Sequence, residues 1–399
     1  MAIINTRIGD VLELQRGYDL PSSQMEDGHV LVAGSNGVIG HHNVERSNTP
    51  CITVGRSGSV GKVHLYNAPT WAHNTALFIK DFKGNDPYYL YYFLRNLHLD
   101  SIFGKSSSVV PSLDRKVVHA ISVPFQNDIN RQKDIAQTLL LLDRKIELNR
   151  QINDNLEAMA KQLYDYWFVQ FDFPNEEGKP YKSSGGKMVW NEKLKREIPE
   201  GWNCMCIGDY AKCKGGYAFK SKDFTDKGTP VIKIGNIQEN YTLNMVDSQC
   251  INNFDNFLFI AKKYDLVIAM TGATIGKFAI SPKEYFVNQR VGRFDLGESP
   301  LTRLGYLFNS LKQEYFREQV FQIASGCAQP NISSDQIDSI VVLNPKMSVL
   351  NNFNKLCEPI LKQQVENILQ IENLTKLRDE LLPLLMNGQV SVNYHLSDD

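Results

Sequence analysis

Residues 135–167 read IAQTLLLLDRKIELNRQINDNLEAMAKQLYDYW, and this stretch decides how the rest of the chain is organised. Two lines of residues recur at seven-residue intervals: Ile135, Leu142, Asn149, Leu156 and Leu163 in the first, and Leu139, Ile146, Asn153, Ala160 and Trp167 in the second. A heptad pattern sustained without proline or glycine is typical of a coiled-coil helix. We predict one helix over Asp128–Val169, closed by Phe171 to Pro174. About 40 helical residues would span roughly 60 Å.

The same order of motifs stands before this helix and again after it. Such an internal repeat predicts two copies of one fold. The matched segments, first copy before second, are Ile8-Gly9-Asp10 and Ile207-Gly208-Asp209, Gly17-Tyr18 and Gly216-Tyr217, Cys51–Lys62 (CITVGRSGSVGK) and Leu266–Lys277 (LVIAMTGATIGK), His73-Asn74-Thr75 and Val287-Asn288-Gln289, Ser108–Leu113 and Gly326–Ile332, and Ile121–Pro124 and Ile340–Pro345. Strands are expected at residues 29–33, 51–54, 76–79 and 119–123, and a helix at 87–96.

A second long helix is expected at about Ser348–Leu382. Shifting the first helix by 218 residues places Leu142 on Ile360, Asn149 on Asn367 and Leu156 on Leu374. The two helices would then pair as an antiparallel coiled coil, with Asn149 and Asn367 meeting in the seam to fix its register, or with both facing water at a bend. The expected fold class is α+β. It has two similar α/β domains (1–125 and 201–346), two spacer helices (126–171 and 347–386), a surface linker (172–200) and a C-terminal tail (387–399).

Composition sets outer bounds on the function. The chain has 399 residues and a formal net charge of −1, which argues against bulk electrostatic coating of nucleic acid. Neither a signal peptide nor an apolar run long enough to span a membrane is evident, so the expected location is the cytoplasm. The seven cysteines are odd in number and poorly spaced for zinc, so reduced thiols and no metal site are expected. His41-His42 is read as part of a surface loop.

The sequence offers no catalytic constellation that we recognise. The Gly55–Lys62 turn resembles a phosphate-binding loop, but its glycines are spaced wrongly and Val63 replaces the Ser or Thr that would hold magnesium. Asp86-Pro87-Tyr88-Tyr89 only faintly resembles a methyltransferase tetrad. A metal-dependent nuclease motif and a nucleophile elbow are both missing. We therefore expect a protein that is not an enzyme and needs no cofactor.

Polar and basic residues recur on the same glycine-bearing turns of both copies. Amide side chains suit bidentate contacts to adenine, and Arg or Lys suits guanine or phosphate. For any one of them, a solvated surface charge remains the simpler interpretation. The predicted DNA-binding residues are Tyr18, Arg56, Lys62, His73, Asn74, Lys105 and Arg115 in the first copy, and Lys214, Tyr217, Lys220, Thr271, Lys277, Asn288, Gln289, Arg290, Gln329 and Asn331 in the second.

The chain resembles the specificity subunits of type I restriction–modification enzymes. The resemblance covers nearly the whole chain and is carried by the duplicated halves, the RSGSVGK and TGATIGK turns, the helix RQKDIAQTLLLLDRKIELN, and GKPYKSSGGKMVWN before IPEGW. It implies two target recognition domains that each read half of a split, asymmetric site in double-stranded DNA. It also implies paired helices that fix the gap and dock two methyltransferase subunits, with restriction subunits joining through the complex. The first copy departs at Ser108–Leu113, which lacks the amides of Gln329 and Asn331.

Three other interpretations remain open at this stage. A protein-binding scaffold with duplicated domains would retain no DNA in a sequence- or salt-dependent manner. A fused methyltransferase would bind S-adenosylmethionine on its own. A subunit of a system that only modifies DNA would differ in its partners and not in this sequence.

Overall fold

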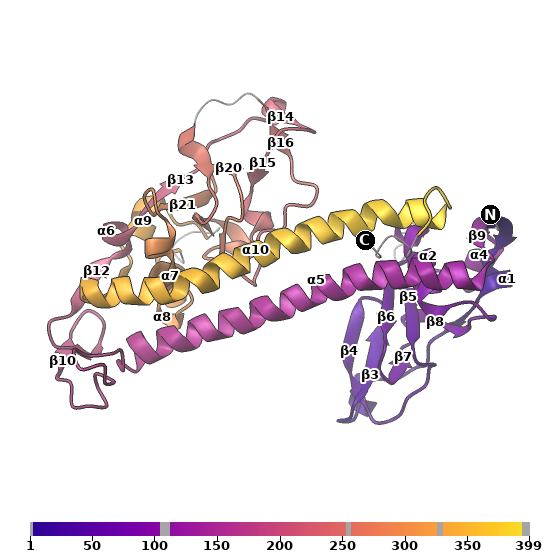
Figure 1. Ribbon diagram of the computed structural model, residues 1–399, viewed down its shortest axis with the longest axis horizontal. Coiled ribbons are helices and arrows are strands. Elements are labelled where there is room, and N and C mark those ends of the chain that lie inside the picture. Colours follow the sequence, from indigo (N-terminus) through magenta and orange to yellow (C-terminus); the bar gives the residue numbers. More distant parts are fainter. Residues whose placement is uncertain (1–2, 104–111, 253–256, 325–329, 393–399) are drawn as a thin grey trace, which may run out of the picture. The chain divides into compact units, whose positions relative to one another are not determined.

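The structure is a computed structural model, and it describes residues 3–103, 112–252, 257–324 and 330–392. The chain divides into two compact units, formed by residues 1–147 with 373–399 and by residues 148–372 (Figure 1). Helices α5 (Ile129–Tyr164) and α10 (Met347–Met386) each begin in one unit and end in the other. No described helix is long and apolar enough to cross a membrane.

The first unit contains three small sheets. The elements before α5 are β1 (Ile3–Arg7), α1 (Ile8–Val11), β2 (Glu13–Arg16), β3 (Val30–Gly34), β4 (Gly37–His42), β5 (Cys51–Gly55), β6 (Val63–Tyr66), β7 (Thr70–Ala72), β8 (Ala76–Asp81), α2 (Pro87–Asn96), α3 (Leu99–Phe103), α4 (Arg115–Ala120) and β9 (Ser122–Gln126). Their strand orders are β1-β9, β2-β8-β5-β6 and β4-β3-β7, and only the β3–β7 pair is parallel among those described.

The second unit repeats this plan with additions. Between α5 and α10 lie β10 (Met188–Asn191), β11 (Arg196–Pro199), β12 (Asn203–Cys206), α6 (Ile207–Tyr210), β13 (Lys212–Gly215), β14 (Phe224–Thr225), β15 (Thr229–Ile232), β16 (Cys250–Ile251), β17 (Ile260–Ala261), β18 (Leu266–Ala269), β19 (Phe278–Ile280), β20 (Tyr285–Val287), β21 (Val291–Asp295), α7 (Leu301–Leu311), α8 (Glu314–Ala324), α9 (Ser334–Asp338) and β22 (Val341–Asn344). The β12-β22 and β13-β21-β18-β19 sheets repeat two sheets of the first unit, and the parallel β15–β20 pair repeats β3–β7.

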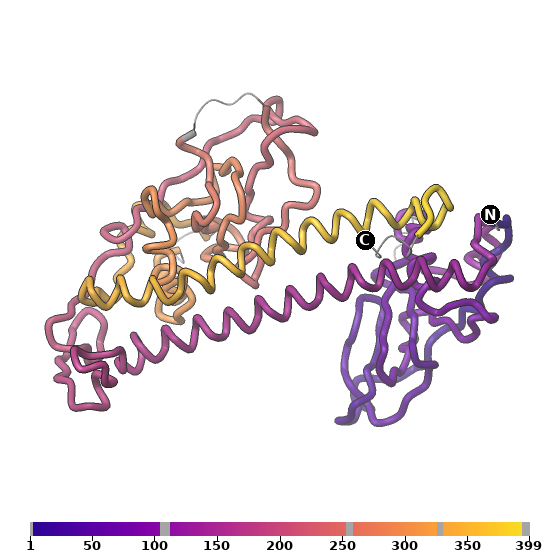
Figure 2. Tube along the Cα trace, viewed as in Figure 1, coloured from indigo at the N-terminus to yellow at the C-terminus, as the bar shows by residue number. Residues whose placement is uncertain are grey.

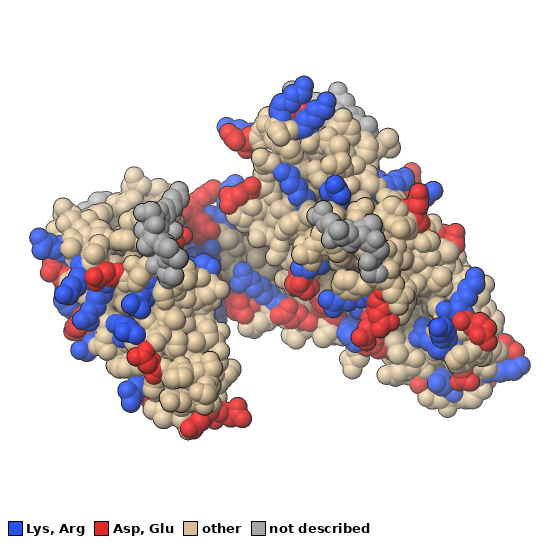
Figure 3. Space-filling model, turned by 180° about the vertical axis from the view of Figure 1, so that it is seen from behind, with Lys and Arg blue, Asp and Glu red and all other residues tan. Residues whose placement is uncertain are grey.

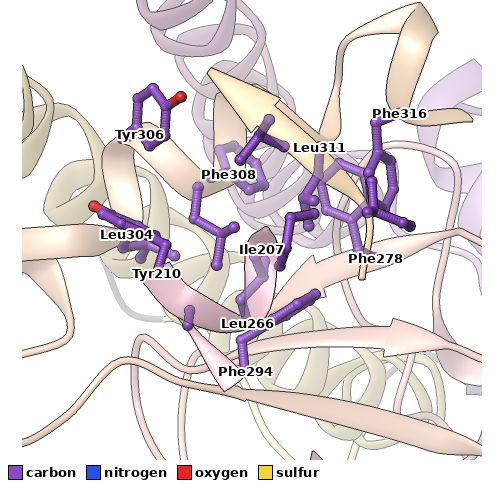
Figure 4. Close-up of a cluster of buried hydrophobic side chains, with 14 of the residues drawn as sticks. Ile207, Tyr210, Leu266, Phe278, Phe294, Leu304, Tyr306, Phe308, Leu311 and Phe316 are labelled. Carbon is purple, nitrogen blue, oxygen red and sulfur yellow. The ribbon is translucent and has the colours of Figure 1, made fainter. Parts of the chain in front are cut away.

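The predicted fold class is therefore confirmed, and the repeat extends to strand order. The core of the second unit is rich in aromatic and aliphatic side chains from α6, α7 and the β18-containing sheet (Figure 4). Leu266, Phe294 and Leu304 are all fully buried there. Burying side chains of this size contributes roughly 1.5–3 kcal/mol each, so the second unit has a frame firm enough to hold surface loops.

Within each unit, a segment of α5 lies beside a segment of α10 that runs in the opposite direction (Figures 1 and 2). In the second unit, Asn153 of α5 contacts both Gln364 and Asn367 of α10. In the first unit, Arg378 of α10 pairs with Asp143 of α5 at 2.7 Å. The α5 helix ends in a π-helical turn, Asp165–Val169, after which Phe171 adopts a positive φ of 63°.

Two local predictions differ from the structure. His119 was expected in a strand, but it lies in α4, which Asp114 caps by accepting a hydrogen bond from the Lys116 N–H. The expected linker over residues 172–200 contains the β10–β11 hairpin, and buried Phe173 stacks on Trp202 at 4.7 Å. The polar, turn-rich composition of the linker hid the anchoring ring of Phe173.

Candidate nucleic-acid interface

Each unit contains the same pair of isolated backbone bridges. The first joins Tyr18 to His73 and, in the second unit, Tyr217 to Asn288, in parallel orientation in both. The Tyr18 N–H donates to the Ala72 carbonyl at 2.8 Å, and the Tyr217 N–H donates to the Val287 carbonyl at the same distance. The aromatic residue and the polar residue after the parallel strand are therefore held together by main-chain atoms.

The glycine before each tyrosine is explained by this close approach. A Cβ atom on Gly17 would lie 2.1 Å from the His73 carbonyl oxygen, and one on Gly216 would lie 2.2 Å from that of Val287. Both contacts involve rigid backbone, so no other residue fits without a shift of the chain. The repeated Gly-Tyr dipeptide thus marks the point where the polar turn is fixed.

The second bridge fixes the glycine-bearing turn that follows β5 or β18. It joins Ser57 to Ser112 in the first unit and Thr271 to Asn331 in the second. Gly61 and Gly276 adopt φ values of 81° and 79°, where L residues other than glycine are strained. These bridges confirm that Ser112 and Asn331 are equivalent.

Backbone hydrogen bonds next to these bridges correct our alignment of the two copies by one residue. The Leu113 N–H donates to the Arg56 carbonyl, whereas the Ile332 N–H donates to that of Met270. The counterpart of Arg56 is therefore Met270. By the tyrosine bridges, His73 corresponds to Asn288 and not to Val287.

Thr271, the counterpart of Ser57, was predicted to contact DNA, and its side chain is buried in the turn. Its side chain is 5% exposed, and its hydroxyl donates to the Pro330 carbonyl at 3.2 Å. The residue holds the turn together and has no hydroxyl proton left to offer a ligand.

Several predicted basic residues have partners within their own unit. Lys62 donates to Asn36 at 2.8 Å, Lys277 pairs with Glu239 at 2.7 Å, and Lys214 pairs with Asp295 at 2.7 Å. The ammonium of Lys277 lowers the pKa of Glu239, and that of Lys214 lowers the pKa of Asp295. The two ion pairs are partly or largely exposed, so solvent screens them and each contributes little to stability.

The polar turn beside the tyrosine differs most between the two units. In the first unit, Asn74 donates to Asp19, and the His73 ring contacts the Thr75 hydroxyl at 2.9 Å. Arg56 also points back, with its guanidinium 3.4 Å from the Asn74 carbonyl. In the second unit, Gln289 and Arg290 are exposed.

The remaining predicted residues lie in varied settings. Arg115, Lys220 and Asn331 are exposed, and Tyr217 is 37% exposed beside the Phe219 and Phe259 rings. Lys105 and Gln329 lie outside the described residues.

Sequence reasoning missed Arg46. Its guanidinium lies 5.4 Å from the centre of the Tyr18 ring and 5.0 Å from that of Trp71. Both distances lie within the range of a cation–π contact, and the Arg46 side chain is exposed. The loop that contains Arg46 has no repeating pattern of apolar residues from which its position could be predicted. The only hint was a lone basic residue in the polar stretch NVERSNTP.

A histidine and an aspartate perform the same structural task in the two units. His119 Nε2 accepts from the Leu14 N–H at 2.9 Å, and Asp338 Oδ1 accepts from the Cys213 N–H at 2.7 Å. Burial lowers the pKa of His119 and raises the pKa of Asp338. Since the histidine must be neutral to accept, burial favours the protonation state that this contact requires.

The seam between α5 and α10 is polar at its centre, but its pairing differs from our prediction. Asn367 is 2% exposed and donates to Asn153 Oδ1 at 2.9 Å. Asn149 donates instead to Gln370 at 3.1 Å. In antiparallel helices, Asn149 lies a turn before Asn153 and so faces a position one turn after Asn367. Leu142, Leu156, Ile360 and Leu374 are half-buried.

Charged residues of both signs share the visible surface (Figure 3), and the described cysteines form no disulfide. On the face in Figure 3, Lys and Arg are interspersed with Asp and Glu. The described cysteines are free, and no metal-binding cluster of His, Cys, Asp or Glu occurs among the described residues.

Comparison with known proteins identifies the family. The family model for the type I restriction modification DNA specificity domain matches residues 5–158 and 199–377. The chain is 24% identical over 314 residues to the type I restriction enzyme MjaIX specificity subunit of Methanocaldococcus jannaschii, covering 76% of this chain and 69% of that protein. It is 24% identical over 337 residues to the HindI specificity subunit of Haemophilus influenzae, covering 71% and 72%.

A solved structure shares the fold. The crystal structure of a type I restriction–modification S subunit from M. genitalium superposes with a TM-score of 0.61 at 16% identity, covering 96% of both chains. The duplicated units, the bridges that recur in both and the family match over two segments agree with one another. The chain belongs to the family of type I restriction–modification DNA specificity subunits.

Proposed function

We propose that each unit reads one half of a bipartite, asymmetric DNA site as the non-catalytic subunit of a type I restriction–modification complex. The observation that carries this proposal is the pair of bridges. Both units hold Tyr18 or Tyr217 against the polar turn in the same way. The side chains on that turn differ, with His73 in one unit and Asn288 in the other. Two domains that share a backbone arrangement but present different side chains are suited to recognising two different DNA sequences.

The paired helices supply the spacing in this proposal. A heptad added to both helices lengthens them by roughly 10 Å at 1.5 Å per residue, which is about three base pairs at 3.4 Å each. The unit boundaries at 147/148 and 372/373 are the natural insertion points, since the added turns then leave each unit intact. The expected result is a longer gap between unchanged half-sites.

The outer face of α5 is the proposed docking surface for methyltransferase subunits. Leu148, Ile152 and Met159 are 47%, 43% and 55% exposed, and their spacing of four and seven residues places them on one side of the helix. Exposed apolar residues in such a row are typical of a protein interface. We propose two methyltransferase subunits, with restriction subunits joining through the complex. Because the substrate would be chromosomal DNA, the proposed location is the cytoplasm.

An exchange of domains tests the proposal. Residues 1–125 would be replaced by the matching part of another specificity subunit, and the complex with methyltransferase subunits would select sites from a random DNA library. One half-site should change while the other and the gap persist. Replacing residues 201–346 is the reciprocal control. A change in both halves after either exchange would refute the two-reader scheme.

A further inference from the structure

Arg290 is a predicted DNA-binding cation whose side chain has no evident structural task. Its side chain is exposed, and among the described residues its guanidinium has neither a hydrogen-bond acceptor nor an ion-pair partner. The cations nearby on the same sheet, Lys214 and Arg293, are paired with Asp295 and Asp265. An unpaired guanidinium on a folded surface contributes nothing to the core that we can identify.

The backbone beneath Arg290 is fixed on both sides. The Arg290 carbonyl accepts from the Met270 N–H at 3.0 Å, and the Arg290 N–H points at the Asn288 side-chain oxygen at 3.4 Å. The Gln289 N–H donates to the Tyr217 carbonyl at 2.9 Å, and the Val291 N–H donates to the Asn288 carbonyl at 2.8 Å. A turn anchored at every residue presents its side chains from a rigid base, as selective recognition requires.

The neighbours of Arg290 are amides and not other free cations. Asn288 and Gln289 precede it, and Gln289 is exposed without a described side-chain partner. Phosphate contacts need only positive charge, whereas a base edge presents donors and acceptors together. Arginine matched bidentately to the O6 and N7 atoms of guanine is the commonest specific contact in the major groove. This mixture of groups fits a base edge better than a phosphate.

The first unit lacks this arrangement at the equivalent place. Thr75 replaces Arg290 there: its carbonyl accepts from the Arg56 N–H at 2.9 Å, as that of Arg290 does from Met270. The neighbouring Asn74 side chain is held by Asp19. A guanidinium on this turn is therefore a feature of the second unit alone, within the part of the chain that the structure describes.

We infer that Arg290 specifies a guanine in the half-site of the second unit. This inference rests on the proposed function and assigns one base pair of the target site to one residue. Breaking one bidentate contact should reduce discrimination at that position by roughly 5- to 150-fold, the range that corresponds to 1–3 kcal/mol. No other position should change, because none of the four hydrogen bonds that anchor the turn involves the Arg290 side chain.

The test uses the full chain in complex with its methyltransferase subunits, selecting sites from a random DNA library that is then sequenced. Arg290→Ala should lose its preference for guanine at one position of one half-site. Arg290→Lys should also lose it, since a lysine keeps the charge without the fork geometry. Arg317→Ala removes an exposed guanidinium from α8 and is the matched control. The half-site of the first unit reports in the same data that the variant is folded and assembled.

The outcomes of this experiment distinguish a failure of the Arg290 assignment from a failure of the proposed function. An unchanged motif with Arg290→Ala, or full retention of guanine with Arg290→Lys, would overturn the assignment while the bipartite motif still stands. Uniform weakening at every sequence would identify a phosphate contact and also overturn it. If the wild-type complex selects no bipartite motif, the proposed function fails and the inference falls with it.

Discussion

Lys312 is buried beneath α5, and its replacement should change how stability depends on pH. Its side chain is 4% exposed, and its ammonium lies 4.0 Å from the centre of the Phe308 ring and 4.6 Å from that of Tyr241. Glu157 of α5 lies 3.4 Å away as the counter-ion, but the ammonium has no hydrogen-bond partner among the described residues. Burial lowers the pKa of Lys312 from 10.5 to about 8, although Glu157 opposes the shift.

The direction of the effect follows from proton binding. Between about pH 8 and 10.5 the unfolded chain holds a proton on Lys312 that the folded chain has released. The free energy of unfolding therefore rises with pH across this window, and the gain is lost as the pH falls through about 8. A shift of this size corresponds to about 3 kcal/mol. Lys312→Met keeps the contacts with Phe308 and Tyr241 but removes the titrating group.

The measurement compares urea unfolding of the wild type and Lys312→Met at several pH values from 7 to 10.5. Tryptophan fluorescence follows mainly the second unit, since Trp167 and Trp202 lie in its core and only Trp71 lies in the first unit. Other lysines and tyrosines titrate in both proteins, so only the difference between the two curves reports Lys312. The wild type should gain about 3 kcal/mol relative to the variant over this range. Parallel curves would show that Lys312 titrates as though exposed, and the reasoning would be refuted.

Three further predictions concern the interface and the seam. Gly216→Ala should disorder the polar turn and abolish selection of one half-site, whereas Gly235→Ala, where an added Cβ meets nothing within 4 Å, should leave site selection unchanged. Asn153→Leu alone should lower stability by about 1–3 kcal/mol in a thermal melt, because it leaves the Nδ2 of buried Asn367 without its acceptor, and adding Asn367→Leu should recover most of that loss; additive losses would contradict the pairing. Arg46→Ala should weaken DNA binding in a filter assay and reduce its salt dependence by about one ion, and an unchanged salt slope would argue against a contact.

The long helix and the repeat were predictable because both depend on residues whose chemistry repeats along the chain. Leu139 and Ile146 are buried as their seven-residue spacing implies. The Gly-Tyr pairs were found by identity alone, and the structure explains them by the backbone contact at Gly17 and Gly216.

What could not be predicted depends on contacts between distant segments. The turns after β5 and β18 both end in Gly-Lys, so the sequences align without a gap. The hydrogen bond from Gly55 to Lys62 nevertheless spans one residue fewer than that from Ala269 to Lys277. Arg46 was missed because its partners, Tyr18 and Trp71, come from other segments. Asn149 was paired wrongly because equivalence in a repeat is not contact.

The two bridges that hold the polar turns consist entirely of main-chain atoms, and this bears on how such a protein changes over generations. Drift at His73 or Asn288 alters what the turn displays without disturbing the bonds between main-chain atoms that hold it. The glycines are different, because a single added methyl group meets backbone there. A lineage could therefore acquire a new target through a few surface substitutions while Gly17 and Gly216 stay fixed. The residues that would contact DNA and the residues that hold the turn are different, so a change of target need not destabilise the fold.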